Sequence, residues 1–400
     1  MKTLETQIQN LFDKTDHTDW ELVKFGDVVN EVKETSQDSV VVEDSRIVGL
    51  DNLTPLDIHI RTWGEAGDGK TFTRTFKKGQ VLFGRRRAYQ RKASLAEFDG
   101  VCSGDIIVME ANNEKMESSL LPFLVHSDRF YEWAVSTSAG SLSPRTKFKD
   151  LAEFQFRLPP MPLQKKLSEI LWLADSLEEK HRLAYNKFLQ VRLAYLIESY
   201  EKISDKLVPL GDLPILNING LWRSDEPDTV QVKVMRSTEF SAFGEIDLSK
   251  LEPFPVSRKK YGKSKLLPGD IIVERSGGGP AQPVGRVCYF DIPTGDYSFS
   301  NFTSSIRVDD KDTLDPKYLF YFLETFYERG LTERIQKQTT GIRNLNYDLY
   351  LATKVPMPDI DTQKTLVSQI EEIELNRHKL NTQIDQTKVL RNTILNRIFT

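Results

Sequence analysis

The chain has little cysteine, little histidine and no long apolar run, and each shortage removes a class of protein. Its 400 residues include two cysteines, Cys102 and Cys288, in apolar contexts typical of strands. We therefore expect reduced core thiols in the cytoplasm and no disulfide framework. The five histidines lack the spacing of metal ligands. No stretch approaches the roughly 20 apolar residues of a membrane-spanning helix, and the first residues lack the apolar segment of a secretory signal.

Motifs for covalent chemistry are also scarce. Residues 64–71 have the spacing of a phosphate-binding P-loop, but Phe72–Phe76 alternate like a strand where that motif requires a helix. The pair Pro159-Pro160 lacks the polar and aromatic neighbours of an amino-methyltransferase loop, and Gly277–Pro280 is typical of a turn. We expect no catalytic residue, cofactor or metal in this chain. A P-loop enzyme stays open as an alternative, and it requires nucleotide binding that Lys70→Ala abolishes.

Two segments lack both proline and glycine and come after the same stop signal. Leu163–Tyr200 comes after Pro159-Pro160-Met161-Pro162, and Thr362–Ile398 comes after Pro356-Met357-Pro358. Apolar residues recur in each in steps of three and four, which predicts two antiparallel coiled-coil helices, each about 55 Å long. The predicted interface between these helices consists of Leu167, Ile170, Ala174, Leu177, Phe188, Val191, Leu366, Ile370, Ile373, Leu380, Ile384 and Ile394.

Two cations interrupt the second of these apolar seams, at Arg377 and Arg391. A cation inside a helix interface needs a carboxylate partner. The seam therefore tolerates these arginines if they pair with Glu178, Glu179 or Glu198 on the other helix.

The globular parts before each helix repeat a series of landmarks in the same order, which predicts two diverged copies of one domain. One identical pair of strings, Gly104–Val108 and Gly269–Val273, breaks that order, and we treat it as chance. The predicted boundaries are 1–159 for the first domain, 160–205 for the central helix, 206–355 for the second domain and 356–400 for the C-terminal helix. The repeated landmarks are Leu22–Asp27 with Leu207–Asp212, Lys77–Phe83 with Leu267–Val273, Gly140–Leu151 with Gly341–Tyr350, and the two Pro-Met-Pro signals.

Within each copy, short runs rich in β-branched and aromatic residues alternate with turns, and each copy ends in a helical piece. This texture predicts two mixed α/β domains. The predicted strands are Ile47–Leu50, Phe72–Phe76, Val81–Phe83, Ile106–Met109, Val230–Val234, Ile271–Val273 and Val287–Phe290, and the predicted helices are Leu120–Val135 and Pro316–Lys337.

Basic residues are concentrated although the net charge is −4. Residues 70–94 and 258–265 contain no acidic residue, and each group lies beside one of the landmark glycines Gly79 and Gly269. Matching basic clusters on the two copies favour two nucleic-acid-binding surfaces, one on each copy. The predicted DNA-binding residues are Lys77, Lys78, Arg85, Arg86, Arg87, Tyr89, Gln90, Arg91, Lys92, Arg145, Lys147, Arg258, Lys259, Lys260, Lys263, Arg275, Asn301, Arg343, Asn344 and Asn346.

Two halves that open on a Leu-x-x-Leu/Phe-Gly-Asp phrase and close on Pro-x-Pro, a glutamine and a long helix resemble the specificity subunit of type I restriction-modification systems. The resemblance covers nearly the whole chain. It implies two target-recognition domains that read an asymmetric split DNA site, with the helices as a ruler between them. It also implies two adenine-methylating modification subunits, which bind S-adenosylmethionine, and restriction subunits that use ATP.

Two further alternatives stay open. One is the recognition subunit of a restriction system that cuts on both sides of its site. The other is a coiled-coil scaffold for proteins, which predicts no salt-sensitive affinity for DNA.

Overall fold

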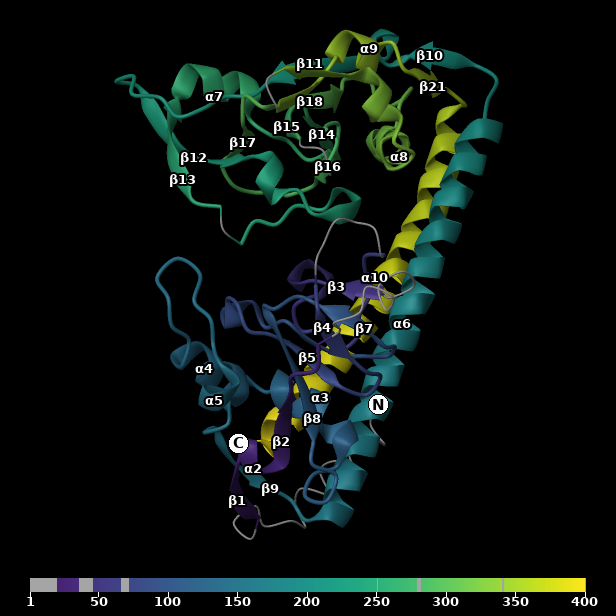
Figure 1. Cartoon of the computed structure of the whole chain (residues 1–400). Coiled ribbons are helices and arrows are strands. Elements are labelled where there is room, and N and C mark those ends of the chain that lie inside the picture. The colour runs from purple at the N-terminus through teal and green to yellow at the C-terminus, as the bar shows by residue number, and fades with distance from the viewer. Residues whose placement is uncertain are drawn as a thin grey trace. The chain divides into compact units, whose positions relative to one another are not determined.

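The computed structural model describes residues 20–35, 46–65, 72–249, 251–278, 282–339 and 342–399, except for the side chains of 338 and 339. The chain divides into two compact units: unit 1 comprises Met1–Leu183 and Asn381–Thr400, and unit 2 comprises Ala184–Leu380. Both units are mixed α/β, as the sequence predicts (Figure 1). No helix within these described ranges is long and apolar enough to cross a membrane.

Unit 1 contains a four-stranded sheet, a three-stranded sheet and a two-stranded ribbon. Its strands are β1 (Glu21–Lys24), β2 (Val29–Val32), β3 (Arg46–Val48), β4 (Arg74–Phe76), β5 (Val81–Gly84), β6 (Ala93–Leu95), β7 (Gly100–Cys102), β8 (Ile106–Ala111) and β9 (Gln155–Leu158). Its short helices are α2 (Phe25–Val28), α3 (Leu121–His126), α4 (Asp128–Ser136) and α5 (Phe148–Leu151). The strand orders are β2-β8-β5-β6, β3-β7-β4 and β1-β9.

Unit 2 has the same plan with one more sheet. Its strands are β10 (Leu207–Pro209), β11 (Ile215–Asn219), β12 (Thr229–Met235), β13 (Pro253–Ser257), β14 (Asp270–Glu274), β15 (Ser276–Gly278), β16 (Val287–Phe290), β17 (Tyr297–Phe299), β18 (Thr303–Val308), β19 (Gln336–Thr339), β20 (Ile342–Leu345) and β21 (Lys354–Pro356). Its short helices are α7 (Arg258–Ser264), α8 (Pro316–Glu328) and α9 (Tyr347–Leu351). The strand orders are β11-β18-β14-β16, β13-β12-β17, β15-β20-β19 and β10-β21.

A central strand separates two apolar cores in each unit. Successive side chains of a strand point to opposite faces. Accordingly, Val81 and Phe83 of β5 join the core that contains α3 and α4, whereas Leu82 joins the core behind β3 and β4. In β14, Ile271 and Val273 likewise join one core, and Ile272 joins the other. Burial on both faces explains why these strands are continuous apolar runs in the sequence.

The turn before each central strand is built in the same way. Gly79 has φ 93° and Gly269 has φ 101°, a region that favours glycine. The next side chain closes the turn: the Gln80 side chain accepts from the amide of Lys77 at 2.8 Å, and the Asp270 carboxylate accepts from the amide of Leu267 at 2.8 Å. The sequence pairing of these two segments is therefore confirmed.

The two copies diverge in their three-stranded sheets. The parallel pair β3 and β7 corresponds to the parallel pair β12 and β17, but the third strand joins on opposite sides, as β4 beside β7 and β13 beside β12. The identical strings Gly104–Val108 and Gly269–Val273 lie on non-equivalent strands, because β8 corresponds to β18 and not to β14. The match between these two strings is therefore chance, as their order along the chain predicts.

The glutamine after each Pro-Met-Pro signal ties a long helix to the globular part of its unit. Gln164 donates to the carbonyls of Pro159 (2.9 Å) and Lys115 (3.3 Å) and accepts from the amide of Glu117 (2.8 Å). Gln363 makes the corresponding three bonds to Pro358 (3.0 Å), Thr313 (3.0 Å) and Asp315 (2.9 Å). Both glutamines are buried, so these bonds satisfy the polar atoms of their own side chains as well as the backbone groups they contact.

Both predicted long helices are confirmed, as α6 (Met161–Lys202) and α10 (Ile360–Ile398). Within each unit their halves run antiparallel (Figure 1). In unit 1, Asp175 contacts Arg391 and His181 contacts Thr387. In unit 2, Arg192 contacts Glu374 and Tyr195 contacts Gln369.

The ends of the helix seam are buried in the globular cores. Leu167 and Ile394 belong to the core of unit 1, and Leu366 and Ile370 to that of unit 2. Ala174 and Ile384 are also buried, and Ile170, Leu177, Phe188, Ile373 and Leu380 are half-buried.

The prediction for Val191 is wrong. Its side chain is 63% exposed, and the neighbouring Arg192 is buried instead. Arg391 pairs with Glu178 at 2.9 Å, as one of the expected pairings requires. Arg377 differs from the expectation: it pairs with Glu374 on its own helix and with Glu245 of unit 2. The period of apolar residues along one helix does not reveal that a buried cation is paired with a carboxylate from the globular part.

The predicted helical pieces are shorter than expected. Residues 120–135 divide into α3 and α4 at Ser127, whose hydroxyl caps α4 by accepting from the amide of Phe130. The segment 316–337 is helical in α8 and then turns at Gly330 into the hairpin of β19 and β20. Most of the P-loop-like segment, residues 66–71, lies outside the described residues, and the next regular element along the chain is the strand β4, not a helix.

Candidate nucleic-acid interface

Each unit contains two paired backbone segments beside its central sheet. We call Arg85–Arg87, which comes after β5, the first arm of unit 1, and residues 139–146, which come after α4, its second arm. The first arm of unit 2 is Arg275–Gly278, which comes after β14, and its second arm is the β19–β20 hairpin. These four segments carry many of the predicted DNA-binding side chains.

The arms pair through the same backbone bonds in both units. The amide of Thr146 donates to the carbonyl of Arg85 at 3.0 Å, and the amide of Leu345 donates to the carbonyl of Arg275 at 2.8 Å. Ladder pairs extend this contact, Arg86 with Arg145 in unit 1 and Ser276 with Asn344 in unit 2. The structure therefore places Arg85 and Arg275 at equivalent positions.

One carboxylate organises the guanidinium groups of unit 1. Arg145 Nε donates to Asp105 at 2.8 Å, and Arg86 Nη1 lies 3.8 Å from the same carboxylate. The hydrogen bond from Arg145 lowers the pKa of Asp105, so the carboxylate stays ionised. The side chains of Arg86 and Arg145 remain 41% and 44% exposed, respectively. Arg85 is half-buried, and its Nε donates to the carbonyl of Thr146 at 3.2 Å.

The rest of the basic cluster of unit 1 curls around a tight turn. Arg87 and Arg91 flank this turn with φ 54° and 55°, a conformation uncommon for residues with a side chain. Tyr89 between them is 57% exposed, and Gln90 is half-buried. Arg91 pairs with Asp128, and its guanidinium lies 5.1 Å from the ring centre of Tyr131. The turn thus presents Tyr89 and holds Arg91 against the core.

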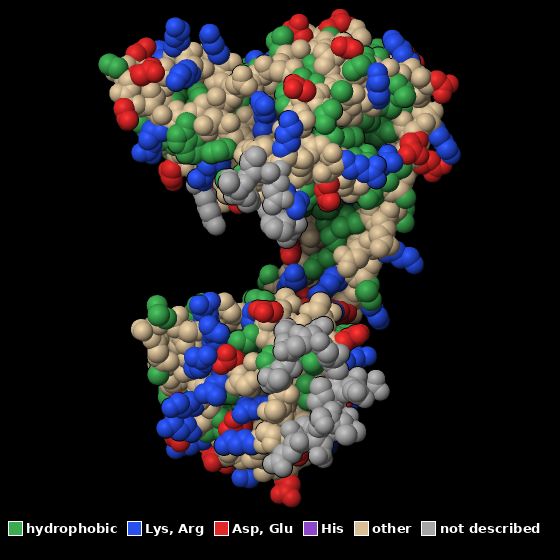
Figure 2. Space-filling model, turned by 45° about the horizontal axis from the view of Figure 1, so that its top comes forward, with side chains coloured by type: hydrophobic (Ala, Val, Ile, Leu, Met, Phe, Trp, Pro, Cys, Tyr) green, Lys and Arg blue, Asp and Glu red, His purple; other side chains and the backbone are tan. Residues whose placement is uncertain are grey.

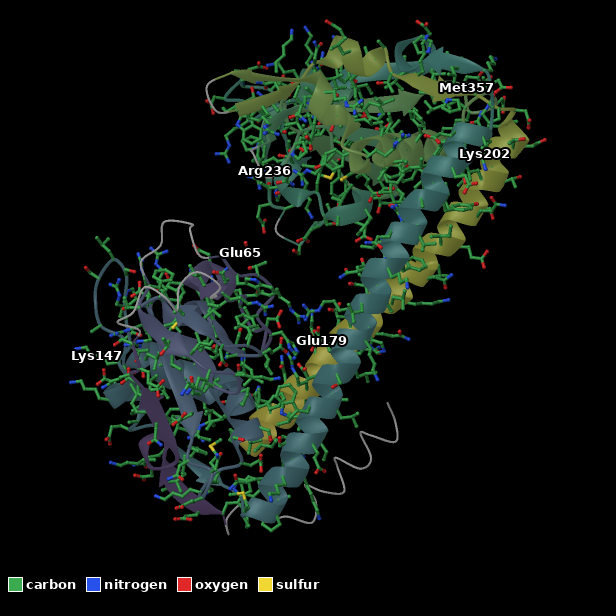
Figure 3. The ribbon with its side chains drawn as sticks, turned by 45° about the vertical axis from the view of Figure 1, so that its right-hand side comes forward. Glu65, Lys147, Glu179, Lys202, Arg236 and Met357 are labelled. Carbon is green, nitrogen blue, oxygen red and sulfur yellow. The ribbon has the colours of Figure 1, made fainter. Side chains whose placement is uncertain are left out.

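The lysines of unit 1 fall into two groups. Lys92 Nζ donates to the carbonyl of Leu50 at 2.7 Å, which is a structural bond. Lys77, Lys78 and Lys147 are exposed. Lys147, which precedes α5, lies on the side of unit 1 away from α6 (Figure 3). In Figure 2, Lys and Arg side chains gather at the left-hand side of unit 1, the lower unit, with a few acidic side chains among them.

The arms of unit 2 combine one arginine with asparagines. The guanidinium of Arg275 lies 4.2 Å from the ring centre of Tyr347, which fixes its position by cation–π attraction. Asn301 is exposed in the turn before β18, and Arg343 and Asn344 lie on β20. The side chain of Asn346 has a structural role, because it caps α9 by accepting from the amide of Leu349.

The predicted equivalence of the two basic clusters is wrong. Residues 258–263 form α7, whose exposed face carries Arg258, Lys259, Lys260 and Lys263, and α7 precedes β14. The cluster at 85–87 comes after the equivalent strand, β5, so the two clusters belong to opposite ends of that strand. Both lie near a landmark glycine in the sequence, and that nearness conceals the difference.

Sequence reasoning also missed exposed apolar side chains beside the arms. Leu142 in the second arm of unit 1 is 91% exposed, Ile342 in the second arm of unit 2 is 52% exposed, and Phe302 beside Asn301 is 55% exposed. A search for charge does not find such residues. A usable signal is the placement of Leu142 between Gly140 and Pro144, because a turn puts its central side chain into solvent.

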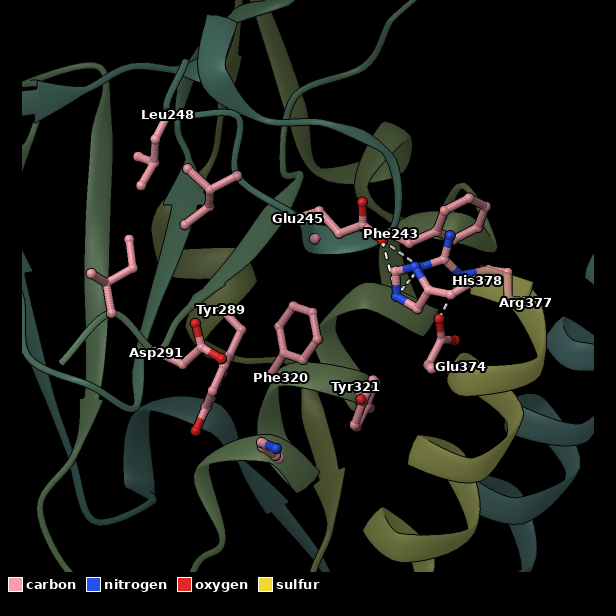
Figure 4. A pocket seen from close by; sticks show the side chains of 14 residues that line it. Phe243, Glu245, Leu248, Tyr289, Asp291, Phe320, Tyr321, Glu374, Arg377 and His378 are labelled. Atoms are coloured by element: carbon pink, nitrogen blue, oxygen red, sulfur yellow. Dashed lines mark hydrogen bonds and ion pairs between the residues drawn. The ribbon is translucent and has the colours of Figure 1, made fainter. Parts of the chain in front are cut away.

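A separate hollow in unit 2, of about 400 Å³, lies apart from the arms. Figure 4 shows Arg377 and His378 of α10 directed at Glu245, with Phe320 and Tyr321 of α8 nearby. Arg377 also lies 4.3 Å from the ring centre of Phe243. Arg377 and His378 of α10 are paired with Glu245 of the globular part. We therefore interpret the hollow as part of the packing of α10 against the globular part of unit 2.

The sequence matches a family model for the type I restriction modification DNA specificity domain over residues 17–184 and 255–387. The type I restriction enzyme EcoDI specificity subunit of Escherichia coli is 26% identical over 220 residues, which cover 52% of this chain and 44% of that protein. A putative type I restriction enzyme MjaX specificity subunit of Methanocaldococcus jannaschii is 20% identical over 221 residues, with coverages of 52% and 51%. The chain spans about half the length of the curated relatives it matches.

Solved structures share the fold. A type I restriction-modification system S subunit from M. genitalium matches with a TM-score of 0.54 at 13% identity, and the match covers 96% of this chain and 96% of that one. A chain from a study of complex assembly and conformational transition of the type I R-M system has a TM-score of 0.59 at 17% identity, covering 95% of this chain and 97% of its own. The family model matches most of the sequence. The matched residues include repeated landmarks of both units, among them the turns at Gly79 and Gly269 and the two Pro-Met-Pro signals. The chain therefore belongs to the family of type I restriction modification DNA specificity domain proteins.

Proposed function

We propose that this chain is the DNA specificity subunit of a type I restriction-modification complex and that each unit reads one part of a split, asymmetric site. The observation that carries the proposal is the repeated pair of arms, with Arg85 and Arg275 at equivalent positions in two copies of one domain. Two similar but non-identical readers suit two different half-sites. Arginine at an arm can hydrogen-bond to guanine in the major groove, and asparagine to adenine.

The proposal divides direct readout from phosphate contacts. The base-reading candidates are Arg86 and Arg145 in unit 1 and Arg275, Arg343 and Asn344 in unit 2, because they lie on the arms. The phosphate candidates are exposed lysines away from the arms, Lys77, Lys78 and Lys147 in unit 1 and Lys259, Lys260 and Lys263 in unit 2. Phosphate contacts position a protein on the duplex, and base contacts specify the sequence.

Catalysis belongs to partner subunits in this proposal. The chain assembles with two modification subunits, which bind S-adenosylmethionine and methylate adenine, and with restriction subunits that use ATP. The helices α6 and α10 provide both a ruler between the two half-sites and a docking surface for the modification subunits. At 1.5 Å per residue, the 42 residues of α6 correspond to about 60 Å of helix.

The test is a selection of bound sequences from random duplex DNA, with the full chain in complex with its modification subunits. In unit 1 the variants are Arg86→Ala and Arg145→Ala, and in unit 2 they are Arg275→Ala and Arg343→Ala. Loss of one base contact costs about 1–3 kcal/mol and relaxes the sequence at one position. Each variant is therefore expected to relax one half-site and to leave the other unchanged.

Lys33→Ala is the matched control, because Lys33 is an exposed cation of unit 1 that pairs with Glu31 and lies on neither the arms nor the long helices. It is expected to leave both half-sites intact. Equal weakening of all sequences by an arm variant would assign that arginine to a phosphate. If the complex shows no salt-dependent affinity for duplex DNA, the proposed function is wrong.

A further inference from the structure

The second arm of unit 1 presents an aliphatic side chain, Leu142, to solvent from a loop that backbone hydrogen bonds close. Leu142 is 91% exposed at the tip of a five-residue loop that Ala139 and Arg145 close with two backbone bonds of 3.0 and 2.9 Å. The tip has two further anchors. The amide of Arg87 donates to the carbonyl of Pro144 at 2.7 Å, and Arg86 Nε donates to the Ser143 hydroxyl at 2.5 Å.

Unit 2 also has an exposed aliphatic side chain on its second arm. Ile342 lies next to the tip of the β19–β20 hairpin, opposite Thr339, and is 52% exposed. The hairpin is braced from its other side, because β15 pairs with β20 at Ser276 and Asn344. Both second arms therefore carry an exposed aliphatic side chain on a segment that backbone bonds tie to its neighbours.

A single exposed leucine is ordinary on a protein surface. The setting of these two is not, because each stands in a cationic neighbourhood. Arg86 bonds to Ser143 next to Leu142, and Arg145 closes the same loop. In unit 2 the exposed Lys337 lies on the same face of the hairpin as Ile342, because it pairs with Asn344, two residues further along β20. An exposed apolar side chain next to cations does not suit a purely apolar protein surface. It does suit a duplex, which offers phosphates to the cations and stacked bases to the aliphatic group.

We propose that Leu142 and Ile342 are wedges that enter the DNA at their respective half-sites and partly unstack a base step there. This inference rests on the proposed function and adds to it a mode of recognition. Wedge side chains of other DNA-binding proteins are Leu, Ile, Phe and Met, and they kink the duplex. The bonded loop that carries Leu142 suits this role, because a loop without such bonds would lose more conformational entropy on insertion.

The wedges give specificity at base steps where no side chain forms a hydrogen bond with a base. Steps of a pyrimidine followed by a purine unstack most easily, so the step that receives a wedge is expected to be of this kind. A selected half-site would then show a preference at a position where substitution of every arm arginine has no effect. That preference disappears when the wedge is removed.

The experiment uses the complex of the full chain with its modification subunits and duplexes that carry the selected site, with 2-aminopurine placed at successive steps. This base fluoresces more strongly when it is unstacked. The expected result is a rise at one step in each half-site, of which Leu142→Ala abolishes one and Ile342→Ala the other. Affinity is expected to fall between about tenfold and a hundredfold, as for the loss of a buried aliphatic side chain. The dependence on salt stays unchanged, since no phosphate contact is lost.

Two controls separate the wedge from other causes. Leu22→Ala, which removes a leucine that is 60% exposed on β1, is expected to leave both signals intact. Methyltransferases flip their target base, so a rise at the methylated adenine is expected to persist in both wedge variants. If the wild-type complex binds the site tightly without a rise at any other step, or if the rise survives Leu142→Ala and Ile342→Ala, the wedge is wrong and the proposed function stands. Absence of salt-dependent binding would instead refute the proposed function.

Discussion

A buried arginine in unit 2 allows a test of how α6 and α10 are held to the globular part. Arg192 of α6 is about 1% exposed at its side chain and contacts three carboxylates: Glu324 at 2.9 Å, Glu328 at 2.7 Å, and Glu374 of α10. Glu324 and Glu328 belong to α8, so one cation joins three helices. Replacement by methionine keeps much of the volume and removes the charge.

The expected loss of stability comes from the carboxylates that remain. Removing one partner of a buried ion pair costs about 3–5 kcal/mol, because a charge is left buried without a counter-ion. A free-energy change of about 1.4 kcal/mol corresponds to a tenfold change in an equilibrium constant. The protection of the α8 amides against hydrogen exchange should therefore fall by two to four powers of ten. Hydrogen exchange measured by mass spectrometry on peptides from α8 reports this protection. Lys202→Met, at an exposed pair, is the control and should not change the protection.

The pH dependence sharpens the test. Burial raises the pKa of Glu324 to about 8, above the value near 4.5 of an unfolded glutamate. Protonated Glu324 thus contributes stability that is fully present below pH 4.5 and is lost as the pH rises through 8. Arg192 attracts the ionised carboxylate, so Arg192→Met raises this pKa further. The variant should lose much more protection at about pH 8.5 than at about pH 5, and equal losses at both would refute this reasoning.

Three further predictions concern other hydrogen-bonded or ion-paired side chains. Gln164→Ala and Gln363→Ala each remove a buried side chain that makes three hydrogen bonds to the backbone, and each should lower the free energy of unfolding in chemical denaturation by about 1–3 kcal/mol. His59, whose pKa the hydrogen bond to Asp175 raises to about 9, stabilises unit 1 fully below pH 6.5 and progressively less up to pH 9. Thermal unfolding of His59→Gln should therefore show a deficit at pH 6 that is gone near pH 10. Asp105→Asn removes the charge that orients Arg145, and in the selection assay it should relax the same half-site as Arg145→Ala while leaving the melting temperature nearly unchanged.

Much of the fold could be predicted because its landmarks have local physical causes. The prolines of each Pro-Met-Pro signal mark the boundary between a globular part and the long helix after it. Glycine permits the positive φ of the turn before β5 and of the turn before β14. The two long helices result from an apolar period without proline or glycine. The order of these landmarks was enough to identify two copies of one domain.

The remaining features depend on contacts between distant parts of the chain. Arg192 rather than Val191 is buried because α8 supplies carboxylates that no pattern within α6 indicates. The pairing of the arms could not be predicted either, since Arg86 and Arg145 meet only when the strand and the loop after α4 are in place. The basic runs single out Arg85–Arg87, whose role stays a prediction, and the proximity of residues 258–265 to Gly269 in the sequence made α7 look like their counterpart.

The central claim is that each unit reads its own part of one split DNA site. The most direct measurement is to co-express the chain with its modification subunits in a host without other adenine methylation and to map N6-methyladenine across the host DNA. The account predicts methylation at one asymmetric, two-part motif, and replacement of Arg86 and Arg145 should alter only one part of it. A continuous motif, a change in both parts at once, or no methylation with the assembled complex would contradict the account.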